Sequence, residues 1–134
     1  MRENGWLLPP GEGPKATLTA FISGDPRLPD AAYPFVRRTL DRLLARHLPA
    51  VRVVFVWRTP GADTLVSRYA RERRLPFDFV AGRGPEELVK TGAGAVVVFD
   101  GGGKESDALM RETRARRLPV RVIDVRRFVT PASP

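Results

Sequence analysis

The apolar residues of this chain fall into two patterns, short continuous runs and longer segments with helical spacing. Five runs are short and rich in β-branched or aromatic residues, as expected for strands that a sheet covers on both faces. These runs are Ala16–Ser23, Val51–Trp57, Phe77–Val80, Ala95–Phe99 and Val120–Val125. They predict five strands.

Helical spacing occupies the segments between the runs. In Ala31–His47, apolar residues recur three or four positions apart, which predicts an amphipathic helix. The other predicted helices are Thr64–Arg74, Ser106–Arg117 and a short helix over Pro85–Lys90, which begins with a favourably placed proline. Strands that alternate with helices predict an α/β fold.

A basic junction ending in Leu-Pro occurs three times along the chain. Its copies are Arg46-His47-Leu48-Pro49, Arg73-Arg74-Leu75-Pro76 and Arg116-Arg117-Leu118-Pro119, each between a predicted helix and a predicted strand. Basic residues stabilise the negative end of a helix dipole, and a proline disfavours helix in the residue before it. Repeated units of this kind predict a mainly parallel five-stranded sheet in a three-layer domain.

The chain of 134 residues has the size of one domain. We expect residues 1–15, rich in Gly and Pro, to form a flexible N-terminal arm, 16–128 to form the domain, and 129–134 a short tail. The arm contains Trp6-Leu7-Leu8, which we expect to dock on the domain or on a neighbouring subunit.

The formal net charge of +8 allows two interpretations. One is binding to nucleic acid, with a stripe of arginines at positions 37, 38, 42 and 46 that Arg126-Arg127 extends. The other is a GC-rich, thermophilic source, because Arg dominates over Lys and prolines are frequent. Arginines at helix ends account for part of the excess.

Other composition data exclude several kinds of site. The chain has no cysteine, so disulfides, thiolate metal sites and cysteine catalysis are excluded, and the single His47 rules out a multi-histidine metal site. No apolar run approaches the roughly 20 residues of a membrane-spanning helix, and the N-terminal segment lacks a signal-peptide core. We therefore expect a cytoplasmic protein without membrane contact, metal or required cofactor.

Three loops follow predicted strands at the edge where parallel sheets bind ligands. In the first, Gly24 permits close backbone approach, and Arg27 is suited to pairing with a phosphate or carboxylate. The alternative is that this loop is a plain turn. In the second loop, Pro60-Gly61-Ala62-Asp63-Thr64, a glycine precedes Asp63 and Thr64 at the start of a helix. A glycine at a strand-to-helix turn followed by Asp and Thr is typical of α/β sites for anionic ligands, so Gly61, Ala62, Asp63 and Thr64 are candidate ligand-binding residues. The alternative is that Asp63 or Thr64 caps the helix.

The third loop, Asp100–Asp107, places three glycines between a buried strand and a helix. Backbone N–H groups of Gly101, Gly102 and Gly103 are expected to form an anion-binding nest, to which Lys104 adds a positive charge and Ser106 a hydroxyl. The loop lacks the spaced Gly-Lys-Ser/Thr signature of a Walker A motif.

Together these loops resemble the YspA-like members of the SLOG superfamily. The resemblance rests on Phe21-Ile22-Ser23-Gly24 with Arg27, on Gly61-Ala62-Asp63-Thr64-Leu65, and on Tyr69-Ala70 with Leu75-Pro76. It identifies the chain as a divergent, Rossmann-like member, related to the LOG phosphoribohydrolases and to the DNA-processing protein DprA. The resemblance implies a nucleotide-type ligand over the strand ends and a homo-oligomer, a dimer or tetramer.

Several functions remain open after this comparison. The leading expectation is a small-molecule binding protein with a nucleotide or nucleotide derivative as ligand. The alternatives are a nucleic-acid-binding basic domain, a degenerate scaffold without ligand, and an enzyme that cleaves a nucleoside monophosphate, as the LOG resemblance implies. In the enzyme, Asp63 or Asp107 would stabilise an oxocarbenium-like centre or position the water. Trp57 would stack on a base or fill the pocket.

Overall fold

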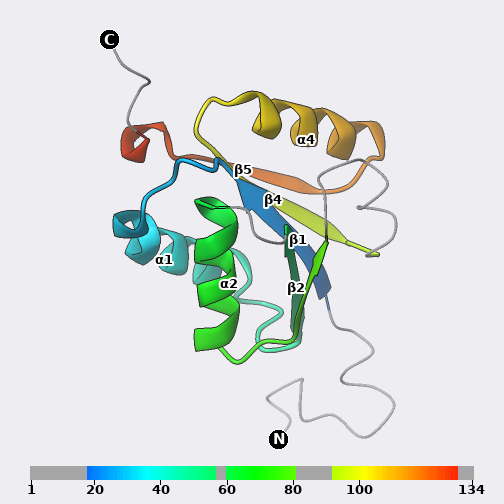
Figure 1. Cartoon of the computed structure of the whole chain (residues 1–134). Coiled ribbons are helices and arrows are strands. Elements are labelled where there is room, and N and C mark those ends of the chain that lie inside the picture. The colour runs from blue at the N-terminus through cyan, green and yellow to red at the C-terminus, as the bar shows by residue number, and fades with distance from the viewer. Residues whose placement is uncertain (1–17, 57–59, 81–91, 130–134) are drawn as a thin grey trace, which may run out of the picture.

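The computed structural model describes residues 18–56, 60–80 and 92–129 (Figure 1). The N-terminal arm, Trp57, the helix expected over Pro85–Lys90 and the residues of the tail from 130 onward lie outside this part of the chain. The expectations that concern them stay predictions.

Within the described residues, five strands form one sheet in the order β3-β2-β1-β4-β5, and every neighbouring pair is parallel. The strands are β1 (Leu18–Gly24), β2 (Val51–Val56), β3 (Phe77–Val80), β4 (Ala95–Asp100) and β5 (Val120–Asp124). Each lies within two residues of its predicted bounds. The predicted parallel sheet is confirmed.

Helices cover both faces of the sheet, which makes a three-layer Rossmann-like domain (Figure 1). The helices α1 (Tyr33–Leu43) and α2 (Ala62–Glu72) lie on one face, and α4 (Lys104–Ala115) lies on the other. A short 3-10 helix, Asp30–Ala32, precedes α1, and a second, Arg126–Phe128, follows β5. Among the described residues, no helix has both the length and the apolar character needed to cross a membrane.

The alternation of side chains along the strands divides the core into two parts. In β4, Val97 and Phe99 face α1 and α2, whereas Val96 and Val98 face α4. The larger part includes Tyr69 of α2, which is fully buried. Its hydroxyl donates a hydrogen bond to Asp41 Oδ1 of α1 (2.7 Å), so the two helices are joined by a polar contact as well as by packing.

Two helices end in the same backbone arrangement, which explains two copies of the basic junction. Arg74 after α2 and Arg117 after α4 adopt left-handed conformations, with φ of 56° and 58°. Leu75 N–H then donates back to Ala70 O (2.9 Å), and Leu118 makes the equivalent bond after α4. This is the Schellman arrangement, which satisfies carbonyl groups at the end of a helix. The predicted helix-to-strand role of both junctions is confirmed.

The predicted helix bounds are wrong at both ends. The helices α2 and α4 end at Glu72 and Ala115, two residues before the predicted ends, and α1 begins at Tyr33 instead of Ala31. The helices α2 and α4 begin at Ala62 and Lys104, two residues before the predicted starts, because Gly61 and Gly103 are the N-cap residues. The first helix ends at Leu43 instead of continuing to His47, and turns lead from there to β2.

Candidate functional site

The carboxyl ends of β1 and β4 mark the point where the chain changes direction across the sheet. From β1 the chain runs outward through β2 to β3, and β4 then lies on the other side of β1. In open α/β sheets ligands bind at this switch point. The loops after β1 and β4 are two of the three loops that the sequence pattern assigns to a ligand, so the topology brings both to the expected place.

Asp25 is buried at the switch point and forms an ion pair with Arg27. Asp25 Oδ1 accepts hydrogen bonds from the backbone N–H of Arg27 (2.8 Å) and from its Nε (3.0 Å), and Oδ2 accepts one from Nη2 (2.8 Å). The same Nη2 donates to the carbonyl oxygen of Gly101 (3.3 Å). The guanidinium therefore bridges the loops after β1 and β4, and 46% of the Arg27 side chain remains exposed. The sequence pattern predicts that the Arg27 guanidinium pairs with a ligand anion; in the structure its two donor groups bind the Asp25 carboxylate.

Gly24 and Gly101 allow these two loops to approach each other closely. A Cβ atom on Gly101 would lie 2.3 Å from Asp25 Oδ2, and one on Gly24 would lie 2.4 Å from the carbonyl oxygen of Phe99. Asp25 N–H donates to that Phe99 oxygen (3.0 Å). Both predicted glycines thus have a clear structural role in bringing the loops together.

The turn Pro60–Thr64 packs against the loop after β1. Gly61 has a φ of 77°, which disfavours other residues, and a Cβ on it would lie 2.4 Å from the backbone of Pro26. Ala62 N–H donates to Asp25 O (3.0 Å). The start of α2 is therefore fixed against the first loop by backbone contacts.

The Asp63 side chain is buried in the first turn of α2 and accepts hydrogen bonds on both oxygens. Oδ1 accepts from Val56 N–H at the end of β2 (2.9 Å), and Oδ2 accepts from the Ser23 hydroxyl at the end of β1 (3.0 Å). Asp63 thus joins β1, β2 and α2, and the N-cap residue of α2 is Gly61. Its neighbour Thr64 is exposed on the surface of α2.

The loop after β4 forms a tight turn before α4. Asp100 Oδ1 accepts a hydrogen bond from Gly102 N–H (2.8 Å), and Gly102 has a φ of 92°. One of the three glycine amides expected to face an anion is therefore bonded to Asp100. Gly103 is the N-cap residue and has no side chain that could cap the helix, so α4 begins without side-chain capping from that position.

Ser106 carries a buried hydroxyl group at the start of α4. The residue is 2% exposed, and its hydroxyl has no hydrogen-bond partner among the residues that the structure describes. It is the third residue of α4, where the first N–H groups of a helix lack intrahelical acceptors. Lys104 and Asp107, on the same end of the helix, are exposed. The first turn of α4 therefore combines a buried, unbonded hydroxyl with a lysine.

The structure brings the predicted residues together in two groups. Gly24, Arg27, Gly61, Ala62 and Asp63 meet around the loop after β1, where their contacts are with the protein. The second group is at the start of α4 and consists of Gly101, Gly102, Gly103, Lys104 and Ser106.

Asp25 was absent from the predicted site, although a repeated spacing could have revealed it. Asp124 and Arg126 follow β5 with the same Asp-x-Arg spacing and the same geometry: Asp124 Oδ1 accepts from Arg126 N (2.9 Å) and Nε (3.0 Å), and Oδ2 accepts from Nη2 (2.8 Å). Arg126 lowers the pKa of Asp124 to about 2. Asp-x-Arg at the end of a strand therefore forms a local ion pair in this fold, buried at Asp25 and exposed at Asp124.

Among the described residues, no three side chains of His, Cys, Asp or Glu are grouped as metal ligands would be. Comparisons of the chain with protein-family models, with curated proteins and with solved structures find no match. The resemblance to the SLOG superfamily therefore rests on the quoted sequence motifs alone.

Proposed function

We propose that this protein binds a small molecule, a nucleotide or nucleotide derivative, beyond the carboxyl ends of β1 and β4. The position of the switch point in the parallel sheet supports this site. The motif resemblance to the nucleotide-binding SLOG superfamily supports the class of ligand. Among the alternatives, the phosphoribohydrolase hypothesis has less support. Its candidate carboxylate Asp63 already accepts hydrogen bonds on both oxygens, from the Ser23 hydroxyl and from Val56 N–H.

The observation that carries the proposal is the Ser106 hydroxyl, buried and without a partner in the described part of the chain. A buried polar group without a hydrogen bond costs about 1–3 kcal/mol, so such groups are rare unless a ligand or water satisfies them. Ser106 lies in the first turn of α4, where free N–H groups and the helix dipole favour an anion. A phosphate group of the ligand would satisfy the hydroxyl and these N–H groups together, with Lys104 supplying positive charge.

The test is a calorimetric titration with AMP, ADP-ribose and a cyclic nucleotide, combined with the Ser106→Ala variant. We expect at least one of the three to bind, and Ser106→Ala to weaken that binding about tenfold or more, as for the loss of one hydrogen bond to a charged group. Without ligand, the variant should be at least as stable as the wild type, because it removes an unbonded buried hydroxyl.

Thr113→Val is the matched control for Ser106→Ala. Thr113 is a second buried hydroxyl of α4, but it donates to Leu109 O (2.7 Å). Its substitution should lower stability and leave nucleotide affinity unchanged. If none of the three nucleotides binds at millimolar concentration, or if Ser106→Ala binds as tightly as the wild type, the proposal is wrong.

Exposed arginines on and just after α1 favour nucleic-acid binding as a second candidate function. Arg37, Arg38 and Arg42 are exposed on α1, and Arg46 is exposed just after it; none forms a salt bridge with a described residue. Such a surface predicts binding to single-stranded DNA whose affinity falls steeply with salt concentration. The double variant Arg37→Gln/Arg38→Gln should weaken this binding without changing nucleotide affinity, and equal DNA binding by the variant would exclude this surface.

A further inference from the structure

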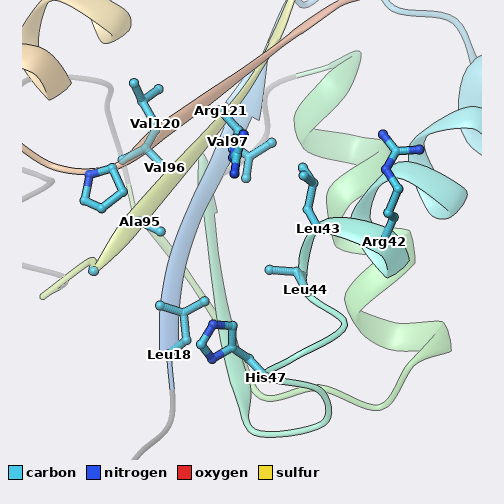
Figure 2. A pocket seen from close by; sticks show the side chains of 12 residues that line it. Leu18, Arg42, Leu43, Leu44, His47, Ala95, Val96, Val97, Val120 and Arg121 are labelled. Atoms are coloured by element: carbon cyan, nitrogen blue, oxygen red, sulfur yellow. The ribbon is translucent and has the colours of Figure 1, made fainter.

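A pocket of about 590 Å³ lies at the opposite edge of the sheet, away from the loops described above (Figure 2). It is bounded by the amino-terminal ends of β1, β4 and β5 on one side and by the last turn of α1 on the other. Figure 2 shows Leu44, just after α1, pointing toward the sheet, with Leu43 beside it and His47 near Leu18. The size lies within the range of small-molecule sites.

The pocket exists because α1 and α2 cover only part of their face of the sheet. The helix α2 packs on β1 and β2. Beyond the carboxyl ends of β4 and β5, the chain that follows β5 packs on α1. The ring centroids of Phe128 and Phe35 lie 5.2 Å apart there. Between these two regions, the amino-terminal halves of β4 and β5 face the open pocket.

Arg121 is a charged residue at a position where the strand pattern calls for an apolar one. It is in register with Val97, as Ile123 is with Phe99, and residues in register on parallel strands face the same side. Val97, Phe99 and Ile123 all belong to the core on the α1 and α2 face. Arg121 therefore lies on the pocket side of β5, and Figure 2 shows it beside Val97.

The lining combines an apolar floor with positive charges. Its apolar part includes Leu18, Leu43, Leu44, Ala95 and Val97. Arg42 and Arg121 stand on opposite sides of the pocket, on α1 and β5, together with His47. Among the described residues, no acidic side chain lines the pocket, and neither arginine forms a salt bridge.

We propose that this pocket binds an amphipathic organic anion, such as a medium-chain fatty acid, as a second site distinct from the nucleotide site. The apolar chain contacts the leucines of α1 and the floor formed by β4, which removes apolar surface from water. The anionic head lies at the rim, where Arg121 and Arg42 supply positive charge without a protein carboxylate that competes for them. The two sites lie at opposite edges of the sheet, so either proposal can fail without the other.

The test uses decanoate below its micelle concentration, with decanol and decyltrimethylammonium as matched ligands. Binding is followed by amide chemical shifts in the full-length protein. We expect decanoate to shift the amides of Leu44, His47, Ala95 and Arg121, decanol to bind more weakly, and the cation not to bind. The amides of Gly102 and Lys104 should not shift, which separates this site from the nucleotide site.

Arg121→Gln is the decisive variant, and Arg111→Gln is its matched control. Arg111 is an exposed arginine of α4 on the other face of the sheet, so both variants remove one positive charge. Loss of a charged hydrogen-bond partner should weaken decanoate binding about fivefold or more in Arg121→Gln and leave it unchanged in Arg111→Gln. Ala95→Leu, which fills the pocket, should abolish binding while the spectrum retains its dispersion.

Several results would overturn the proposal. These are equal decanoate affinity in Arg121→Gln and Arg111→Gln, shifts spread over all basic surfaces, or no binding of decanoate. Nuclear Overhauser contacts from the Ala95 and Val97 methyl groups to Trp6, or to a second copy of the chain, in the ligand-free protein would also overturn it. Such contacts would mean that protein already occupies the pocket.

Discussion

Replacement of Asp63 tests whether the Pro60–Thr64 turn serves the fold or the chemistry of a site. Asp63→Ala leaves two buried donors, Val56 N–H and the Ser23 hydroxyl, without their acceptor. A buried donor without a partner costs about 1–3 kcal/mol. Because the hydroxyl can rotate and the amide cannot, we expect the free energy of unfolding to fall by about 3 kcal/mol, a large part of the about 5–15 kcal/mol typical of a domain.

Asp63→Asn separates the effect of charge from that of hydrogen bonding. The amide oxygen can still accept from Val56 N–H, and the amide nitrogen can donate to Ser23 Oγ, which then acts as acceptor. Compared with the wild type, Asp63→Asn loses the negative charge in the first turn of α2, and its hydrogen bonds are no longer assisted by that charge. We therefore expect this variant to lose only about 1 kcal/mol.

Urea unfolding followed by circular dichroism measures these losses through linear extrapolation. Ser23→Ala and the double variant Ser23→Ala/Asp63→Ala complete a cycle, in which we expect a coupling energy of about 1 kcal/mol. If Asp63→Ala unfolds within about 0.5 kcal/mol of the wild type, the range of ordinary surface substitutions, Asp63 does not have this structural role. Equal instability of the Asn and Ala variants would also contradict it.

Two backbone positions and the Tyr33 hydroxyl give three further expected outcomes. Arg117→Gly should stabilise the protein by about 0.5–1 kcal/mol in urea unfolding, because glycine adopts the left-handed φ of 58° without steric strain, whereas Arg117→Ala should bring no gain. Gly101→Ala should cost about 1–3 kcal/mol through the clash with Asp25, while Gly94→Ala, whose Cβ would meet its nearest atom at 3.5 Å, should change stability by less than about 0.5 kcal/mol. Burial and the hydrogen bond to Glu72 raise the pKa of Tyr33 to about 12. Since an unfolded tyrosine ionises near pH 10, the stability that Tyr33 contributes is complete below pH 10 and lost as the pH rises through about 12. Tyr33→Phe should therefore lose less stability than the wild type between these values, and equal losses would contradict the assignment.

The strands could be predicted because their signal is local. Continuous β-branched runs such as Val51–Val56 are buried on both sheet faces, so their composition alone identifies them. The helix starts were less accurate because side-chain caps are the usual sequence signal. In this chain glycines occupy the N-cap positions of α2 and α4, and Asp63 and Ser106 lie inside the first turn of these helices.

The roles of the site residues could not be predicted, because their partners are distant in sequence. Asp63 bonds to Ser23, 40 positions away, and Arg27 to Gly101, 74 positions away. These pairs depend on which strand ends become neighbours in the sheet. The pocket at the amino-terminal edge has a weak sequence signal for a different reason: a single arginine, Arg121, within an apolar run does not differ in sequence from an arginine at the surface of an edge strand.

Among the described residues, two arginines at the carboxyl edge of the sheet are paired with carboxylates of the protein, and this limits how a ligand can be held there. Asp25 pairs with Arg27, and Asp124 with Arg126. Part of the net charge of +8 lies on the exposed arginines of α1. An anion at the carboxyl edge would depend on the first turn of α4, where backbone N–H groups and the Ser106 hydroxyl act at short range. Nucleotide binding should consequently depend weakly on salt concentration, whereas binding of a polyanion to the α1 surface should depend on it strongly.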